Sequence, residues 1–256
     1  MKLFSKIYGD KRQDLIVIHG LFGMSDNWNS LGKKFAKYWR VHLIDLRNHG
    51  RSPHAKDFNY DVMCKDILEY MEDNNIQKPI LLGHSLGGKV GMRFTFKYPE
   101  KIEKLIIADI SPREYNTDFF QNLLQLLHTL PLESFERREE IDHVLSFTYK
   151  DKDMRLFLLK NLYRKENKEF AWRFNIDVLL EKVSSIQEAD FIQGICAVPT
   201  HFIRGGKSNY ITNEDELIIH KHFSDFSITT IDGAGHWLHV ENPERFYNEV
   251  MEFCLM

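Results

Sequence analysis

The sequence has few cysteines, no long apolar run and little excess charge of either sign. Its three cysteines, Cys64, Cys196 and Cys254, fit neither a disulfide framework nor a zinc motif. No stretch reaches the roughly 18 apolar residues of a membrane helix, and the N-terminus lacks an apolar signal segment. A net charge of -3 gives no basic field for nucleic acid. We therefore expect a cytoplasmic protein that binds neither membrane nor nucleic acid.

What is present is typical of a folded globular chain with a sizeable core: 256 residues, of which 43% are hydrophobic and 28% charged. Short apolar runs that favour buried parallel strands lie at residues 15–18, 41–44, 79–82, 105–108, 200–203 and 227–231. Helical periodicity lies mostly between them, at residues 28–38, 60–73, 86–98, 215–222 and 243–253. The alternation predicts an α/β fold with a mostly parallel, doubly wound sheet.

One interval breaks this alternation. Between Ser111 and Val198 no strand run is evident, whereas leucine and phenylalanine recur at helical spacing, as at residues 119–130 and 154–163. We interpret residues 111–198 as a mostly helical cap inserted into a core domain formed by residues 1–110 and 199–256.

A candidate nucleophile lies directly after the third apolar run. Residues 83–87 read GHSLG, and a helical pattern follows, which is the strand-turn-helix setting of the G-x-S-x-G motif. Glycines two residues either side of Ser85 permit a sharp turn that projects its hydroxyl from the sheet. The turn also places Ser85 at a helix N-terminus, so we expect the backbone N–H of Leu86 to stabilise an oxyanion.

The same residues admit a rival reading as a P-loop. Residues 83–89 match the first seven positions of G-x-x-x-x-G-K-[ST]. The apolar run 105–108 is followed by Asp109, as in a strand that ends in a magnesium-binding aspartate. The next position, however, is Val90, which lacks the hydroxyl that holds magnesium. Because a P-loop NTPase would also leave the motifs around His19, Arg47 and His236 without a role, we favour a hydrolase with Ser85 as its nucleophile.

The predicted base is His236, in the segment GAGHW that follows the last strand run, where the histidine of this fold comes last in chain order. The acid is less direct, because the loop 204–209, a frequent place for it, contains no carboxylate. Glu214 and Asp215 are simply explained as first-turn helix residues, and Asp232 is too near His236 in sequence. Asp109 ends the strand after that of Ser85, so we predict that it orients His236; the alternative is that it only caps a turn.

Two further strand ends carry polar turns. Residues 19–23, HGLFG, suit the loop that supplies the second oxyanion N–H, from Leu21 or, as a substitute, from Phe22. Residues 45–52, DLRNHGRS, read as scaffold, with Asp45 and Arg47 holding neighbouring loops.

Taken together, these segments resemble the α/β-hydrolase superfamily and, more narrowly, the YbfF-type bacterial esterases and their mitochondrial abhydrolase relatives. The resemblance rests on residues 19–23, 27–28, 45–52, 83–90, 109–112, 172–175 and 235–237. It implies a triad acid after the sixth strand, which maps to Asp109. It also implies activity on short acyl esters and on acyl-CoA thioesters, with no metal or organic cofactor.

The resemblance also suggests substrate contacts. Trp172 and Arg173 look like family features that could line the cleft, with packing inside the cap as the alternative, and Phe22 and Trp237 are further candidates. Arg173 or Lys89 could meet a substrate anion.

The sequence therefore predicts a serine esterase or thioesterase, monomeric or homodimeric, in which His236 activates Ser85 and water hydrolyses the acyl-enzyme. Two alternatives stay open. One is carbon-carbon bond hydrolysis or a lyase reaction on the same fold, and the other is a slow-turnover protein that binds a small molecule.

Overall fold

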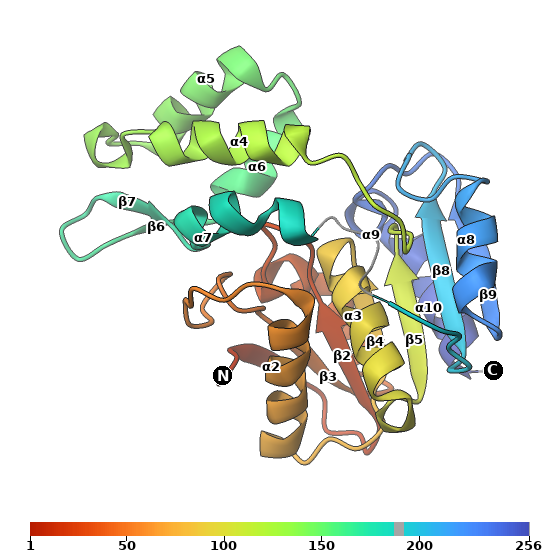
Figure 1. Ribbon diagram of the computed structural model, residues 1–256. Helices are drawn as coiled ribbons and strands as arrows, with labels where there is room; N and C mark the ends of the chain where they lie inside the picture. Colours follow the sequence, from red (N-terminus) through yellow and green to blue (C-terminus); the bar gives the residue numbers. More distant parts are fainter. Residues whose placement is uncertain (187–191, 256) are drawn as a thin grey trace.

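A seven-stranded sheet forms the centre of the computed structural model, which describes residues 1–186 and 192–255 (Figure 1). Its strands follow the order β1-β3-β2-β4-β5-β8-β9, and every neighbouring pair is parallel except β1 with β3. The strands are β1 (Ser5–Tyr8), β2 (Asp14–Ile18), β3 (Arg40–Ile44), β4 (Ile80–His84), β5 (Lys104–Ala108), β8 (Thr200–Gly205) and β9 (Phe226–Ile231). All six predicted strands are confirmed, and among the strands of this sheet only the edge strand β1 was missed.

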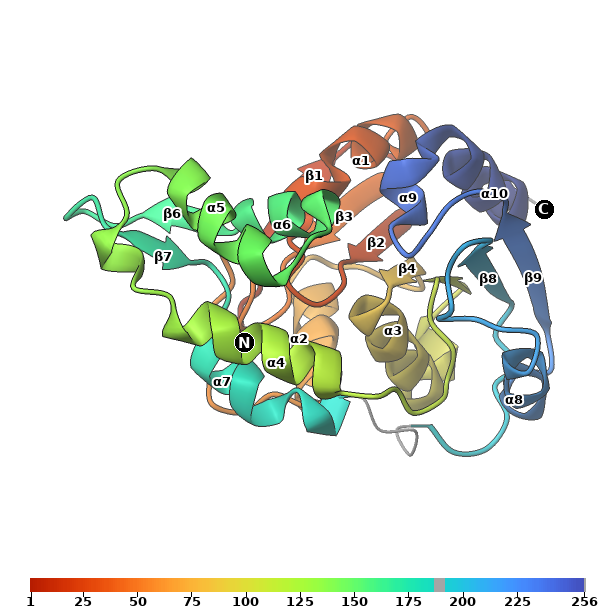
Figure 2. The same cartoon turned by 90° about the horizontal axis from the view of Figure 1, so that it is seen from above.

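Helices cover both faces of the sheet because successive side chains of a buried strand point to opposite faces. Leu15 and Val17 of β2 belong to the apolar cluster shared with α1 and α10, whereas Ile16 and Ile18 belong to the cluster shared with α2, α3 and α8 (Figure 2). The helices of these layers are α1 (Asn29–Phe35), α2 (Tyr60–Asp73), α3 (Leu86–Lys97), α8 (Asp215–His222), α9 (Leu238–Glu241) and α10 (Pro243–Leu255), with the short turns η1 (Ser25–Trp28) and η2 (Pro99–Lys101).

A separate group of elements, the inserted segment, lies beyond one end of the sheet (Figure 1). It contains α4 (Asp118–Thr129), η3 (Leu132–Ser134), α5 (Arg138–Thr148), α6 (Lys152–Leu159), β6 (Leu162–Arg164), β7 (Phe170–Trp172), α7 (Ile176–Lys182) and η4 (Ser184–Ile186). Residues 187–191 of the predicted cap are outside the described residues, and its limits at 111 and 198 stay a prediction.

The antiparallel pair β6 and β7 corrects the expectation that this interval holds no strand. The predicted helical run 154–163 ends at Leu159, because the chain turns there into the hairpin. Three-residue strands on either side of a polar turn leave no apolar run that a sequence pattern detects. Among the described residues, no helix combines the length and the apolar character that a membrane span needs.

Candidate active site

Ser85 occupies a strained turn between β4 and α3. Its backbone has φ 51° and ψ -118°, a conformation that non-glycine residues rarely adopt, and its N–H donates to the carbonyl of Ala108 at 3.0 Å. A Cβ at Gly83 would lie 2.3 Å from the carbonyl oxygen of Gly87, and a Cβ at Gly87 would lie 2.3 Å from that of Ile18. The flanking glycines are therefore required by close backbone packing, as the motif predicts.

Asp109 lies at the end of β5, the strand next to that of Ser85, and its side chain is fully buried. Its Oδ2 accepts from Nδ1 of His236 at 2.8 Å, and its Oδ1 accepts from the N–H of Gly205 at 2.9 Å. The hydroxyl of Ser208 donates to Oδ2 as well. Ser208 was not predicted from the sequence, because only a carboxylate was sought in the loop 204–209. The available signal was that β5 and β8 are neighbouring parallel strands, so the loop after β8 faces Asp109 at the end of β5.

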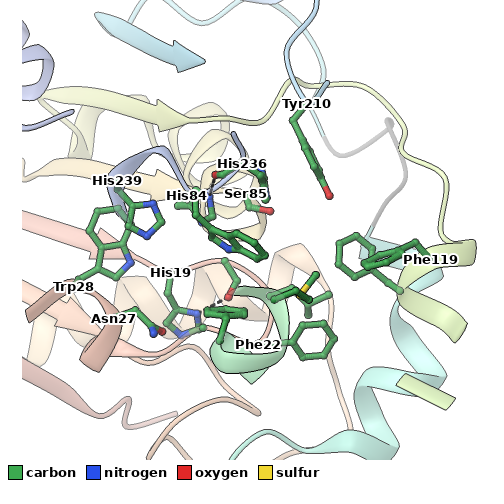
Figure 3. A pocket seen from close by; sticks show the side chains of 17 residues that line it. His19, Phe22, Asn27, Trp28, His84, Ser85, Phe119, Tyr210, His236 and His239 are labelled. Carbon is green, nitrogen blue, oxygen red and sulfur yellow. Dashed lines mark hydrogen bonds between the residues drawn. The ribbon is translucent and has the colours of Figure 1, made fainter. Parts of the chain in front are cut away.

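His236 follows β9 and turns its ring toward the end of the sheet. Since a carboxylate only accepts hydrogen bonds, the contact with Asp109 places the proton on Nδ1 and leaves Nε2 free to accept one. The ring also stacks on Tyr210, with 3.8 Å between centroids and 18° between planes. Ser85 and His236 line the same pocket (Figure 3).

The loop 19–23 passes directly over this turn. A Cβ at Gly20 would lie 3.2 Å from Cβ of Ser85, so the glycine lets the two backbones approach. His19 fixes the loop: its Nε2 accepts from the N–H of Leu46 at 3.0 Å and its Nδ1 donates to the carbonyl of Gly20 at 2.8 Å. Burial lowers the pKa of His19 to about 4, which agrees with this neutral tautomer.

A cavity of about 150 Å³ opens between the sheet and the inserted segment (Figure 3). Most of its side chains are apolar or aromatic, among them Leu21, Phe22, Trp28, Phe119, Phe120, Met154, Phe157, Tyr210 and Trp237. Two of its imidazoles, those of His84 and His239, are neutral, because burial lowers the pKa of His239 to about 3 and that of His84 well below its usual value. The pocket wall therefore suits an uncharged, largely apolar group.

The sequence comparison decides the family. The chain matches the family model of the alpha/beta hydrolase fold over residues 15–243. It belongs to the α/β-hydrolase family. The solved structure of a marine microorganism esterase is 38% identical to this hydrolase, covers 98% of its chain and 99% of its own, and superposes with a TM-score of 0.95.

Two curated relatives of this hydrolase resemble it over nearly its whole length. The sn-1-specific diacylglycerol lipase ABHD11 of Mus musculus is 32% identical over 93% of this chain and 80% of its own. Esterase YbfF of Escherichia coli is 29% identical over 93% of this chain and 92% of its own. The predicted resemblance to this branch is thus confirmed.

The structure separates the four predicted substrate contacts of the hydrolase. Phe22 and Trp237 line the cavity, but Trp172 and Arg173 pack within the inserted segment instead. The indole N–H of Trp172 donates to the carbonyl of Leu127 at 3.3 Å, and the guanidinium of Arg173 lies 5.0 Å from the Tyr163 ring. These contacts show packing inside the cap, the alternative left open by the sequence, and contact of either residue with substrate stays a prediction.

Two other residues considered from the sequence lie near the site or support it. Lys89 is buried on α3 with its Nζ 4.9 Å from the Tyr115 ring, and it borders a narrow cavity beside Ser85. Asp45 accepts from the N–H groups of Ser25 and Arg51.

The scaffold reading of residues 45–52 extends to Arg47, whose guanidinium makes two hydrogen bonds to the Asp66 carboxylate, at 2.5 and 2.7 Å. Asp45 and Arg47 therefore hold neighbouring segments together.

Proposed function

We propose that Ser85, His236 and Asp109 form a catalytic triad and that the protein is a serine esterase. The observation that carries this is the 2.8 Å contact between His236 Nδ1 and Asp109 Oδ2, beside a serine held in a strained turn of the same pocket. The relatives are named as esterases and a lipase, and the chain is an ester-hydrolysing enzyme.

In this mechanism Nε2 of His236 takes the proton of Ser85 as its hydroxyl attacks the acyl carbonyl. The backbone N–H groups of Leu86 and of Leu21 or Phe22 would bind the oxyanion, an arrangement in which each donor contributes about 3 kcal/mol. Asp109 stabilises the imidazolium. The alcohol or thiol leaves with the proton from His236. His236 then takes a proton from water as the water attacks the acyl-enzyme, and returns it to Ser85 as the carboxylic acid leaves.

The substrate that fits is a small, uncharged acyl ester or thioester. An apolar cavity of about 150 Å³ is the size that encloses a benzene molecule, which corresponds to a short acyl chain. We place the enzyme in the cytoplasm, where Cys64, Cys196 and Cys254 would stay reduced. Its action requires no cofactor and no second subunit, so a monomer or a homodimer would serve.

The test is hydrolysis of p-nitrophenyl esters from acetyl to dodecanoyl, with matching thioesters alongside, by the wild type, Ser85→Ala and Asp109→Asn. We expect short chains to be preferred, kcat to fall by about 10⁶ with Ser85→Ala and by about 10⁴ with Asp109→Asn. A fluorophosphonate probe should label only proteins that retain Ser85. Wild-type turnover that survives Ser85→Ala would overturn the mechanism.

Absence of turnover by a folded wild-type protein that the probe does label would instead favour a different substrate class, such as a carbon-carbon bond or a lyase substrate. Absence of both turnover and labelling would favour a binding protein.

A further inference from the structure

Phe22 is held in a backbone conformation that its side chain disfavours. Its φ of 60° lies in the left-handed region, which for a non-glycine residue costs on the order of 1–3 kcal/mol. Phe22 stands in the loop 19–23, where the N–H of Gly23 closes a turn on the carbonyl of Gly20 at 2.9 Å. Such strain persists only where surrounding contacts over-determine the backbone, so the contacts of Phe22 identify what holds this loop.

Those contacts come from the inserted segment. The Phe22 ring packs against Phe174, at 5.2 Å between centroids, and against Phe120, at 6.3 Å. Its carbonyl oxygen accepts from Nδ2 of Asn161 at 2.8 Å. Ring and carbonyl are thus both fixed by residues beyond the sheet, although the loop itself leaves β2.

Asn161 is itself firmly placed between α6 and β6. Its backbone N–H donates to the carbonyl of Leu158 at 2.9 Å, and its own carbonyl accepts from the N–H of Arg173 at 2.9 Å. The side-chain nitrogen has two neighbours, the carbonyl oxygens of Phe22 and Leu158. Because both can only accept, the amide must turn its NH₂ group toward them.

The amide oxygen of Asn161, Oδ1, makes no hydrogen bond to another described residue. The residue is also only 1% exposed. A buried acceptor without a partner loses its hydration, whereas an apolar side chain of similar size would not. Packing alone therefore does not explain an asparagine at this position, and the hydrogen bond to Phe22 is what distinguishes it from leucine.

We propose that Asn161 is a positioning residue for the oxyanion loop. The carbonyl that it holds and the N–H of Phe22 stand on either side of one Cα, so fixing the carbonyl at this φ fixes the direction of that N–H. Leu21 and Phe22 line the same pocket as Ser85, and a Cβ added at the adjacent Gly20 would lie 3.2 Å from Cβ of the serine. The inserted segment thereby orders an oxyanion donor as well as covering the pocket, an inference that rests on the proposed esterase mechanism.

The experiment replaces Asn161 by leucine, which keeps the number and branching of the side-chain heavy atoms and removes the donor. On the preferred p-nitrophenyl ester we expect kcat to fall by about 10- to 100-fold, somewhat less than the loss of a whole oxyanion donor, with KM changed less than about threefold. A trifluoromethyl ketone, which forms a tetrahedral adduct, should lose affinity by the factor lost in kcat/KM. The melting temperature should stay near that of the wild type, since the buried Oδ1 is removed together with the bond.

Tyr60→Phe is the matched control. It also removes a buried side-chain hydrogen bond to the inserted segment, from the Tyr60 hydroxyl at the start of α2 to the carbonyl of Ile186, and neither residue belongs to the loop 19–23. We expect wild-type kcat and inhibitor affinity from this variant.

Wild-type kcat in Asn161→Leu, or equal losses in Asn161→Leu and Tyr60→Phe, would overturn the proposal. If the leucine variant does not fold, Asn161→Ala is measured with the same readouts. Failure of the esterase mechanism is separate, because it would already appear as wild-type turnover that survives Ser85→Ala.

Discussion

The hydroxyl of Ser208 donates to Oδ2 of Asp109, the same carboxylate oxygen that accepts from His236. The loop after β8 therefore carries no acid of its own but binds the acid of the neighbouring strand. With the N–H of Gly205 on Oδ1, both carboxylate oxygens are occupied. Asp109 cannot rotate without breaking these contacts, so the loop sets the direction from which His236 is held.

Ser208→Ala should lower kcat by about tenfold and leave KM nearly unchanged, because it frees the carboxylate without removing its charge. Asp109→Asn should cost far more, about 10⁴, since it removes the charge that fixes the His236 tautomer. Ester hydrolysis at saturating substrate measures both. Ser224→Ala, whose hydroxyl bonds only the Cys196 carbonyl in the described structure, serves as control. Equal rates in Ser208→Ala and the control would contradict the role of the loop.

Gly87→Ala should destabilise the protein strongly, whereas Gly91→Ala on the same helix should be nearly neutral. A Cβ at position 87 would meet the backbone carbonyl of Ile18 at 2.3 Å, which only a shift of α3 relieves. At position 91 the nearest atom is a methyl of Leu105 at 3.2 Å, and alanine improves helix propensity by about 1 kcal/mol. Urea unfolding midpoints measure the difference. We expect about 3 kcal/mol or more between the variants, and similar midpoints would show that the helix adjusts freely.

Phe157→Ala should shift the preference of the enzyme toward longer acyl chains. The Phe157 ring lines the cavity and lies 5.5 Å from the Trp237 ring, so its removal lengthens an apolar pocket. We expect kcat/KM for octanoyl relative to butanoyl esters to rise about tenfold or more. Leu156→Ala, the 45% exposed neighbour on α6, should leave the chain-length profile as it was. An unchanged profile in Phe157→Ala would place the acyl chain elsewhere.

Acid should destabilise the fold well before its carboxylates titrate. Burial lowers the pKa of His19 and His201 to about 4 and that of His49 and His239 to about 3. The unfolded chain binds protons at these rings below about pH 6.5 while the native state does not, so stability is lost as pH falls through this range. Each ring should cost about 2 kcal/mol between pH 7 and pH 5.

Urea unfolding at the two pH values tests this expectation. His201→Gln, a change away from the pocket, should reduce the pH-dependent loss by about 2 kcal/mol relative to the wild type. An identical pH dependence in both proteins would mean that His201 has the same pKa in the native and unfolded states, which would contradict the expectation.

Much of the fold could be predicted because buried parallel strands are continuous apolar runs. Strand β1 was not predicted, because it is a short, half-exposed edge strand that pairs with β3 and has no continuous apolar run. The pair β6 and β7 escaped because three residues per strand carry no pattern. Asp109 could be predicted as the triad acid because it follows the strand next to that of Ser85, and neighbouring parallel strands end at the same edge of the sheet.

The site residues that could be predicted are those that a local sequence motif marks. Ser85 is bracketed by Gly83 and Gly87, and His236 follows Gly233 and Gly235, so the local sequence indicates both turns. Their catalytic roles remain predictions for the enzyme assays. Asn161 and Ser208 carry no local signal, because they act on partners 139 and 99 positions away, respectively. Trp172 and Arg173 carry no signal that separates their two possible roles, because a family feature that packs inside the insertion looks, in sequence, like one that meets substrate.

The position of the insertion in the sheet bears on how the chain folds. It leaves from the end of β5 and returns at β8, two strands that pair directly, with Leu105 opposite Thr200. Closing a long loop between adjacent strands costs only about 0.6 kcal/mol more for each doubling of its length. The sheet can therefore form early with the insertion as an unstructured loop, and insertions of quite different length could be exchanged at this point without changing the strand order.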